Sequence, residues 1–176
     1  MNSDKIRDLL IPAPKEIRIR EGCFQPRPGL RVTADFPEAQ KLRYLLEQCG
    51  GAATVESCSP VGARPALMRL ALGDAPAGWQ CGLAPSLPGA EAYQLDVQAQ
   101  AIRLAARTLS GMAMGLKTLA KLIRGGGELP AMTIQDAPSL DFRGLHLCIF
   151  DPNDGTEKEE TDPSRIRRML RLAAMT

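Results

Sequence analysis

A hairpin followed by a glycine-containing helix constrains this fold more than any other part of the sequence. Two runs with alternating apolar side chains, Tyr93–Val97 and Ile102–Ala106, are separated by a short polar turn, which predicts a β-hairpin. After Thr108, apolar residues recur every three or four positions and form one face of a helix. Gly111 and Gly115 lie one turn apart in this helix, so its backbone can approach a sheet closely. We therefore expect this helix to be a core element that packs over a sheet.

The flanking segments add short strands and one further helix to this α/β pattern. A helix is expected to open at Pro37 and to stop at Gly50. The proline- and glycine-rich stretch 74–89 is expected to be a loop. Short strands are expected at 16–20, 30–34, 54–56, 66–72 and 132–135.

The sequence changes character past Leu129-Pro130. Phe142–Phe150 is a nearly continuous apolar run, typical of a strand that is buried on both faces of a parallel sheet. An acidic loop follows over 151–162, and Asp162-Pro163 predicts the start of a helix. The apolar face of that helix carries Ile166, Met169, Leu170 and Ala173. A single β/α unit of this kind needs parallel neighbours to cover its strand.

These patterns divide the chain into two parts. Residues 1–138 are expected to form an α/β domain, and residues 139–176 are interpreted as the truncated start of a second domain. The chain is therefore expected to be an N-terminal fragment of a longer protein.

Composition limits the expected partners and cofactors. The net charge is only +2, so neither a nucleic acid nor an anionic membrane is expected as a partner, and no apolar run is long enough to span a bilayer. The five cysteines form no Cys-x-x-Cys pair and there is one histidine, so no metal and no cofactor is expected. Unpaired cysteines and the absence of a visible signal sequence favour a cytoplasmic location, and a secreted or periplasmic parent protein stays open.

Four short motifs occur in a fixed order in the second half of the chain. They are a Gly-x-Glu-x-Tyr-x-Leu strand at 89–95, the strand at 102–106, a Gly-x-x-x-Gly-x-x-Thr-Leu-x-x-Leu helix at 111–122, and a crossing segment with Pro130, Ile134, Asp136, Pro138 and Phe142-Arg143-Gly144. In this order they resemble the domain that precedes the catalytic barrel in glycoside hydrolase family 20, the β-N-acetylhexosaminidases. Ile11-Pro12-Ala13-Pro14 is similar to the usual start of that domain. The resemblance implies an α/β accessory domain over 1–138, with helices packed on one side of a sheet, and the first, truncated β/α unit of a (β/α)₈ (TIM) barrel over 139–176.

The resemblance also implies a function for the parent protein. Family members hydrolyse terminal N-acetylhexosamine from glycans with retention, and the 2-acetamido group of the substrate acts as the nucleophile. The assisting Asp-Glu pair lies on a later barrel strand, so no catalytic residue is assigned to this chain. The expected partners are a glycan or glycoconjugate substrate and the parent's own catalytic domain. Arg143 matches the arginine that binds hydroxyls of the terminal sugar, and an ion pair at the domain junction is the alternative for Arg143.

One segment departs from the family pattern. The family usually continues Arg-Gly into Leu-Asp-x-x-Arg, whereas Cys148 and Asp151 occupy the Asp and Arg positions here. This departure allows a divergent branch, or an accessory domain of an O-GlcNAcase-like or α-glucuronidase-like barrel hydrolase. A purely structural or carbohydrate-binding module is the non-enzymatic alternative. Glu91 and Asp96 are strand carboxylates without a partner acid, so no acid–base role is assigned to them.

Overall fold

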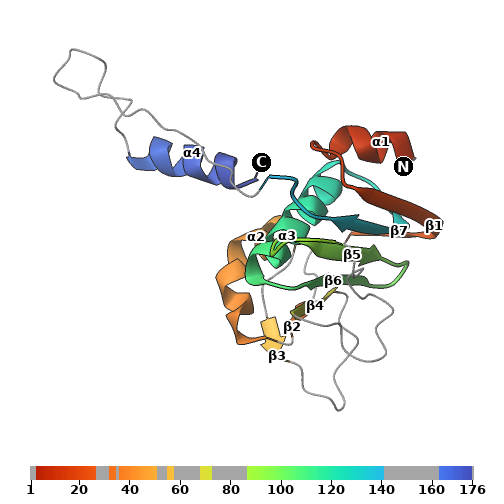
Figure 1. Ribbon diagram of the computed structural model, residues 1–176, viewed down its shortest axis with the longest axis horizontal. Helices are drawn as coiled ribbons and strands as arrows, with labels where there is room; N and C mark the ends of the chain where they lie inside the picture. Colours follow the sequence, from red (N-terminus) through yellow and green to blue (C-terminus); the bar gives the residue numbers. More distant parts are fainter. Residues whose placement is uncertain are drawn as a thin grey trace. The chain divides into compact units, whose positions relative to one another are not determined.

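A mixed β-sheet forms the centre of the first of two compact units, Met1–Pro138 and Ser139–Thr176 (Figure 1). The computed structural model describes residues 3–26, 32–34, 36–50, 55–57, 68–72, 87–140 and 163–175. Within these residues the sheet has seven strands in the order β1-β7-β5-β6-β4-β2-β3. The strands are β1 (Glu16–Phe24), β2 (Val32–Ala34), β3 (Val55–Ser57), β4 (Met68–Leu72), β5 (Tyr93–Val97), β6 (Ile102–Ala106) and β7 (Leu129–Asp136).

The helices of this unit gather around α3 (Leu109–Arg124), which packs against β5 and β6. The short helices α1 (Ser3–Leu9) and α2 (Arg43–Gln48) both contact α3, and α2 continues the 3₁₀ turn η1 (Pro37–Leu42) (Figure 1). The predicted sheet with helices on one side is therefore confirmed.

Strand directions change at the middle of the sheet. β4, β2 and β3 run parallel to β6, while β5 is antiparallel to both β6 and β7. The hairpin predicted for β5 and β6 is thus confirmed, with Tyr93 opposite Ala106 and Val97 opposite Ile102. The chain leaves β6 through α3, crosses over β5 and returns as β7 on the far side of β5. This crossover places α3 above the centre of the sheet.

Alternation along β5 separates two different faces of the sheet. Tyr93, Leu95 and Val97 are fully buried on the face that α3 covers. Gln94 and Asp96 point to the opposite face and are nevertheless buried, with 6% and 3% of their surfaces exposed. Two polar side chains on the opposite face are therefore buried, which is uncommon and requires internal hydrogen bonds.

Thr108 and the two helix glycines fix the contact between α3 and β5. The Thr108 side chain accepts a hydrogen bond from the Gly111 backbone N–H over 3.2 Å, so Thr108 caps the helix. Its hydroxyl donates to the carbonyl of Ala90, in the turn that enters β5. A Cβ on Gly111 would lie 2.7 Å from the Ala92 carbonyl oxygen, and a Cβ on Gly115 would overlap the Leu104 side chain. The close approach predicted for these glycines is confirmed.

The second unit is described through its helix α4 (Pro163–Met175). The helix predicted to begin at Pro163 is confirmed, and Met169 and Leu170 on its apolar face are exposed. The strand predicted at 142–150 and the loop at 151–162 lie outside the described residues. None of the described helices combines the length and apolar character needed to cross a membrane.

Four local expectations need correction. The helix α1 was not predicted, and β1 runs on to Phe24 as an edge strand in which Ile19 is 39% exposed rather than half-buried. β7 is longer than expected and lies inside the sheet, paired with both β1 and β5. Glu91 lies in the turn before β5 and not in the strand.

Candidate functional site

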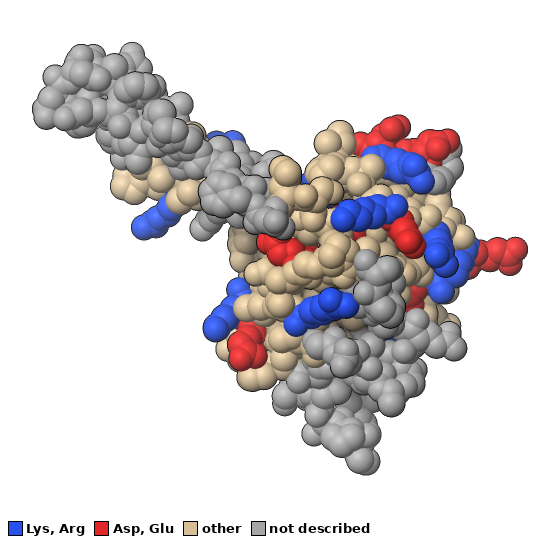
Figure 2. Space-filling model, in the orientation of Figure 1, with Lys and Arg blue, Asp and Glu red and all other residues tan. Residues whose placement is uncertain are grey.

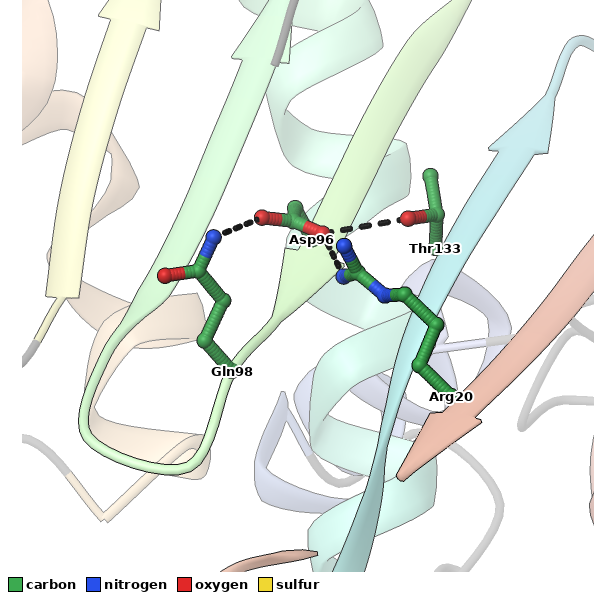
Figure 3. Close-up of polar contacts among 4 residues, drawn as sticks. All are labelled: Arg20, Asp96, Gln98 and Thr133. Carbon is green, nitrogen blue, oxygen red and sulfur yellow. Dashed lines mark hydrogen bonds and ion pairs between the residues drawn. The ribbon is translucent and has the colours of Figure 1, made fainter. Parts of the chain in front are cut away.

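The buried carboxylate of Asp96 is the centre of a polar cluster on the face of the sheet opposite α3 (Figure 3). One carboxylate oxygen, Oδ1, accepts hydrogen bonds from the Arg20 guanidinium and from the Thr133 hydroxyl, the latter over 3.0 Å. The other oxygen, Oδ2, accepts from the Gln98 side-chain amide over 2.7 Å. These contacts join β1, β5, β7 and the turn after β5 through one side chain.

A bulge in β1 allows Arg20 to take part in this cluster. The pairing of β1 with β7 shifts between Ile19 and Cys23, and Gly22 within this irregular stretch has a φ of +100°, which glycine adopts readily. Arg20 therefore reaches from the edge strand across β7 to Asp96 on β5. Its side chain stays 47% exposed, whereas that of Asp96 is only 5% exposed.

The Asp96 cluster is suited to holding strands together rather than to acid–base chemistry. All the contacts that the carboxylate makes in the described part of the chain come from donors, and no second carboxylate takes part. Hydrolysis of a glycosidic bond by two protein carboxylates needs a facing pair. Among the described residues there is also no group of three or more His, Cys, Asp or Glu side chains that could hold a metal ion. The absence of an acid–base role for Asp96 stays a prediction.

A second polar cluster brings three motif residues together at the other end of β5. The Tyr93 hydroxyl lies 2.6 Å from the Thr118 hydroxyl on α3 and donates to Asp136 Oδ2 over 3.5 Å. Asp136 ends β7, and its Oδ1 accepts from the Lys15 backbone N–H over 3.2 Å. Burial raises the pKa of Tyr93, and the neighbouring Asp136 carboxylate raises it further, so the phenol stays protonated. The cluster ties β5, α3, β1 and β7 together just before the chain leaves the domain at Pro138.

A cavity of about 560 Å³ lies next to the C-terminal ends of α2 and α3. Its walls are Gln25, Pro26, Cys49, Gly50, Ile123, Gly127 and Glu128. The Gln25 side-chain amide donates to the Glu128 carboxylate over 2.6 Å, and this bond together with one from Cys23 lowers the pKa of Glu128. Burial raises the pKa of the Cys49 thiol to about 12, so Cys49 is not a nucleophile at neutral pH. The cavity therefore holds a carboxylate but no activated nucleophile.

Charged side chains of both signs are interspersed on the face of the molecule shown in Figure 2. Two of the ion pairs are local, Arg43 with Glu47 one helical turn apart and Arg18 with Glu16 on β1. Exposed pairs of this kind contribute at most about 1 kcal/mol each. Over the described residues on this face, neither sign forms a continuous patch.

The residues singled out around the expected barrel strand lie outside the described residues. This applies to Arg143, Cys148 and Asp151, so the sugar contact predicted for Arg143 stays a prediction. The contact between Arg20 and Asp96 was not predicted. The sequence shows an Asp within one predicted strand and an Arg at the end of another. Their contact could not be predicted, because it depends on β7 lying between β1 and β5.

Comparison with known families decides the identity of the domain. The family model described as "Glycosyl hydrolase family 20, domain 2" matches residues 9–137, which is most of the chain. The chain belongs to glycosyl hydrolase family 20. The matched range covers the whole sheet and α3, so the family 20 domain and the first structural unit coincide closely.

Two curated relatives are named as hexosaminidases. A beta-hexosaminidase of Vibrio vulnificus is 23% identical over 153 residues, 85% of this chain and 16% of the relative. A beta-N-acetylhexosaminidase of Cellulomonas fimi is 31% identical over 91 residues, 49% of this chain and 18% of the relative. The chain thus spans less than a fifth of the length of these two relatives.

The fold of the family 20 domain is also found in solved structures. The β-N-acetylhexosaminidase from Bacteroides fragilis has a TM-score of 0.58 at 20% identity, over 76% of this chain and 25% of that one. The Flavobacterium johnsoniae chitobiase has a TM-score of 0.57 at 24% identity, over 84% of this chain and 23% of that one. At these identities the likeness concerns the fold.

Proposed function

We propose that this chain is the non-catalytic N-terminal part of a β-N-acetylhexosaminidase that removes terminal N-acetylhexosamine from glycans or glycoconjugates. The match of the family 20 domain over residues 9–137 carries this proposal. The names of both relatives, a beta-hexosaminidase and a beta-N-acetylhexosaminidase, support the same activity. Residues 139–176 then form the first β/α unit of the catalytic barrel, and the helix α4 at the expected position supports this assignment.

The proposal divides the work between the two parts of the protein. The carboxylate of Asp96 is occupied by its neighbours, and Tyr93 and Asp136 are bonded to each other and to Thr118 and Lys15. Such saturated clusters stabilise a domain but leave no group free to transfer a proton to a substrate. The domain therefore acts as a scaffold, and hydrolysis belongs to the barrel.

Two features of the barrel chemistry follow from this proposal. The 2-acetamido oxygen of the substrate attacks the anomeric carbon while a barrel carboxylic acid protonates the leaving oxygen, and water then opens the cyclic intermediate with overall retention. Arg143 donates to hydroxyls of the terminal sugar, because its planar guanidinium suits paired oxygens.

Hydrolysis of aryl glycosides by the full-length protein tests the proposed activity. Turnover of an aryl N-acetyl-β-glucosaminide is expected, with slower turnover when the acetyl group is replaced by trifluoroacetyl, because fluorine withdraws electrons from the attacking oxygen. Turnover of an aryl glucuronide instead would reject the assignment. The 176-residue chain is the matched control and should hydrolyse neither compound.

The role of Arg143 is tested separately in the full-length enzyme. Arg143→Lys keeps the charge but loses the paired donors, so KM for the aryl N-acetylglucosaminide should rise about tenfold or more. An unchanged KM would assign Arg143 to an ion pair at the domain junction.

A further inference from the structure

Two glutamine side chains on the face of the sheet opposite α3 have carbonyl oxygens without a hydrogen-bond donor among the described residues. Gln94 on β5 and Gln135 on β7 stand directly opposite each other in the antiparallel pairing. The Oε1 atoms of both side chains are buried, and neither accepts a hydrogen bond in the part of the chain that the structure describes. A buried acceptor without a donor destabilises the folded state, so two adjacent ones need an explanation.

The neighbouring residues explain why the protein itself supplies no donor. Beside Gln94 on the other flank stands Ala105 of β6, which is fully buried and has only a methyl group to offer. Two residues further along β5 and β7, the Thr133 hydroxyl donates to Asp96. The Gln98 amide and the Arg20 guanidinium are directed to the same carboxylate. On β1, Arg18 stands opposite Thr133 and donates to Glu16, which stands opposite Gln135. The Arg20, Gln98 and Thr133 donors thus converge on Asp96, the Arg18 donor goes to Glu16, and none of the four reaches a glutamine oxygen.

We infer that a water molecule is bound between Gln94 and Gln135 and donates one hydrogen bond to each Oε1 atom. Side chains that stand opposite each other in an antiparallel pair have Cβ atoms about 5 Å apart, a separation that one water can bridge. Buried waters occur where polar groups lack protein partners, and they typically make two to four hydrogen bonds. Both oxygens are closed to solvent, so a larger molecule such as a sugar could not reach them without rearranging the surrounding residues. The small Ala105 side chain favours room for water beside Gln94.

This water would complete a polar layer across the centre of the sheet. At one end of the layer Asp96 accepts hydrogen bonds from three side chains. At the other end the water donates hydrogen bonds to two glutamine oxygens. The face opposite α3 is then held together internally, which agrees with the burial of Gln94 and Asp96.

A crystal structure of the 176-residue chain at about 1.8 Å resolution tests the inference directly. We expect a water oxygen about 2.6–3.2 Å from both Oε1 atoms. A direct hydrogen bond between the two side-chain amides, or a protein donor on either oxygen, would overturn the inference.

Solution measurements on variants give a second, independent test. In nuclear magnetic resonance spectra, a long-lived water should give a cross-peak to the Ala105 methyl group, and this cross-peak should disappear in Gln94→Met/Gln135→Met. Gln94→Met and Gln135→Met should each lower the urea midpoint. The double variant should lower it by less than the sum of the two single effects, because no buried oxygen is then left without a donor. Gln48→Met, which removes only a surface bond to Arg124, is the matched control and should change neither readout. A wild-type chain without the cross-peak would contradict the inference even where a variant fails to fold.

Discussion

Adding one methyl group at Gly111 should force α3 away from the sheet. An ideal Cβ at this position would lie 2.7 Å from the carbonyl oxygen of Ala92 and 3.2 Å from that of Ala90. Both are backbone atoms of the turn that enters β5, so neither can rotate away as a side chain could. The Thr108 hydroxyl also donates to the Ala90 carbonyl and ties this turn to the start of the helix. The helix and the turn must therefore separate, and this contact is strained or lost.

The expected size of the effect combines two opposing contributions. Overpacking a buried contact costs about 1–3 kcal/mol, and the backbone atoms at Gly111 place the cost near the upper end. Replacing glycine by alanine in a helix favours folding by about 1 kcal/mol. We therefore expect Gly111→Ala to lower the free energy of unfolding by about 2 kcal/mol. For a chain of this size that corresponds to a fall in Tm of roughly 4–8 °C.

Thermal and urea unfolding of the 176-residue chain, followed by circular dichroism, measure this change. Ser110→Ala is the control, because Ser110 is exposed on the same helix and its change should stay within about 0.5 kcal/mol. Gly115→Ala should also destabilise, by about 1–2 kcal/mol, since a Cβ there meets the buried side chains of Leu104 and Tyr93. A Gly111→Ala chain as stable as the wild type, beside a neutral Ser110→Ala, would refute the close approach of α3 to the turn.

Three further predictions concern buried polar groups. Asp96→Asn should lower the free energy of unfolding by about 2 kcal/mol, because the Arg20 guanidinium loses its charged partner. The loss is smaller than for a fully buried ion pair, since Arg20 is half-exposed. The urea midpoint measures it. Tyr93→Phe should lower the free energy of unfolding by about 1 kcal/mol, because the hydrogen bond to Thr118 is lost. Ultraviolet titration of the wild type and this variant should show that Tyr93 ionises above the usual tyrosine pKa of about 10. The pKa of Cys49 rises from 9.0 to about 12 on folding, so the stability linked to its protonated thiol is complete below pH 9 and is lost as the pH rises toward 12. Cys49→Ala should therefore remove a slope of about 1.4 kcal/mol per pH unit from urea stability curves in this range, and an identical slope in both proteins would contradict the burial of the thiol.

The parts of the fold that were predicted correctly are those encoded by local periodicity. Alternation over 93–97 and 102–106 fixes a hairpin, because its two strands are adjacent in the chain. The repeat of three and four residues after Thr108 fixes α3, and Thr108 caps it as an extended residue with a hydroxyl should. Such signals need no knowledge of the rest of the molecule.

The features that were missed depend on contacts between distant segments. α1 has seven residues and is held by Ile6, which is fully buried, so a periodic pattern has no room to develop. β1 continues beyond Arg20 only because a bulge near Gly22 lets the strand follow β7. The meeting of Arg20 with Asp96, 76 residues apart, requires the sheet order itself. No property of either residue alone determines that order.

The motif residues that carry the family resemblance form one contact surface. Gly111, Gly115 and Thr118 lie at offsets of zero, four and seven along α3, which places them in one stripe of the helix. A Cβ on Gly115 would lie 3.0 Å from the Tyr93 ring, and the hydroxyl of the same ring lies 2.6 Å from Thr118. A larger residue at 115 would therefore displace the ring and break its hydroxyl contact.

This surface explains both the spacing of the helix motif and its link to the strand motif. The glycines bring the helix close to Tyr93, and the Tyr93 hydroxyl then forms a hydrogen bond with the Thr118 hydroxyl. The carboxylate of Asp136, at the end of β7, accepts a hydrogen bond from the same Tyr93 hydroxyl. These motif residues thus pack α3, β5 and β7 of the family 20 domain against one another. Their presence points to the fold of this domain, whereas the activity proposed above would depend on side chains outside it. Mutations in the stripe should consequently change stability first, and activity of the full-length enzyme only as far as folding is lost.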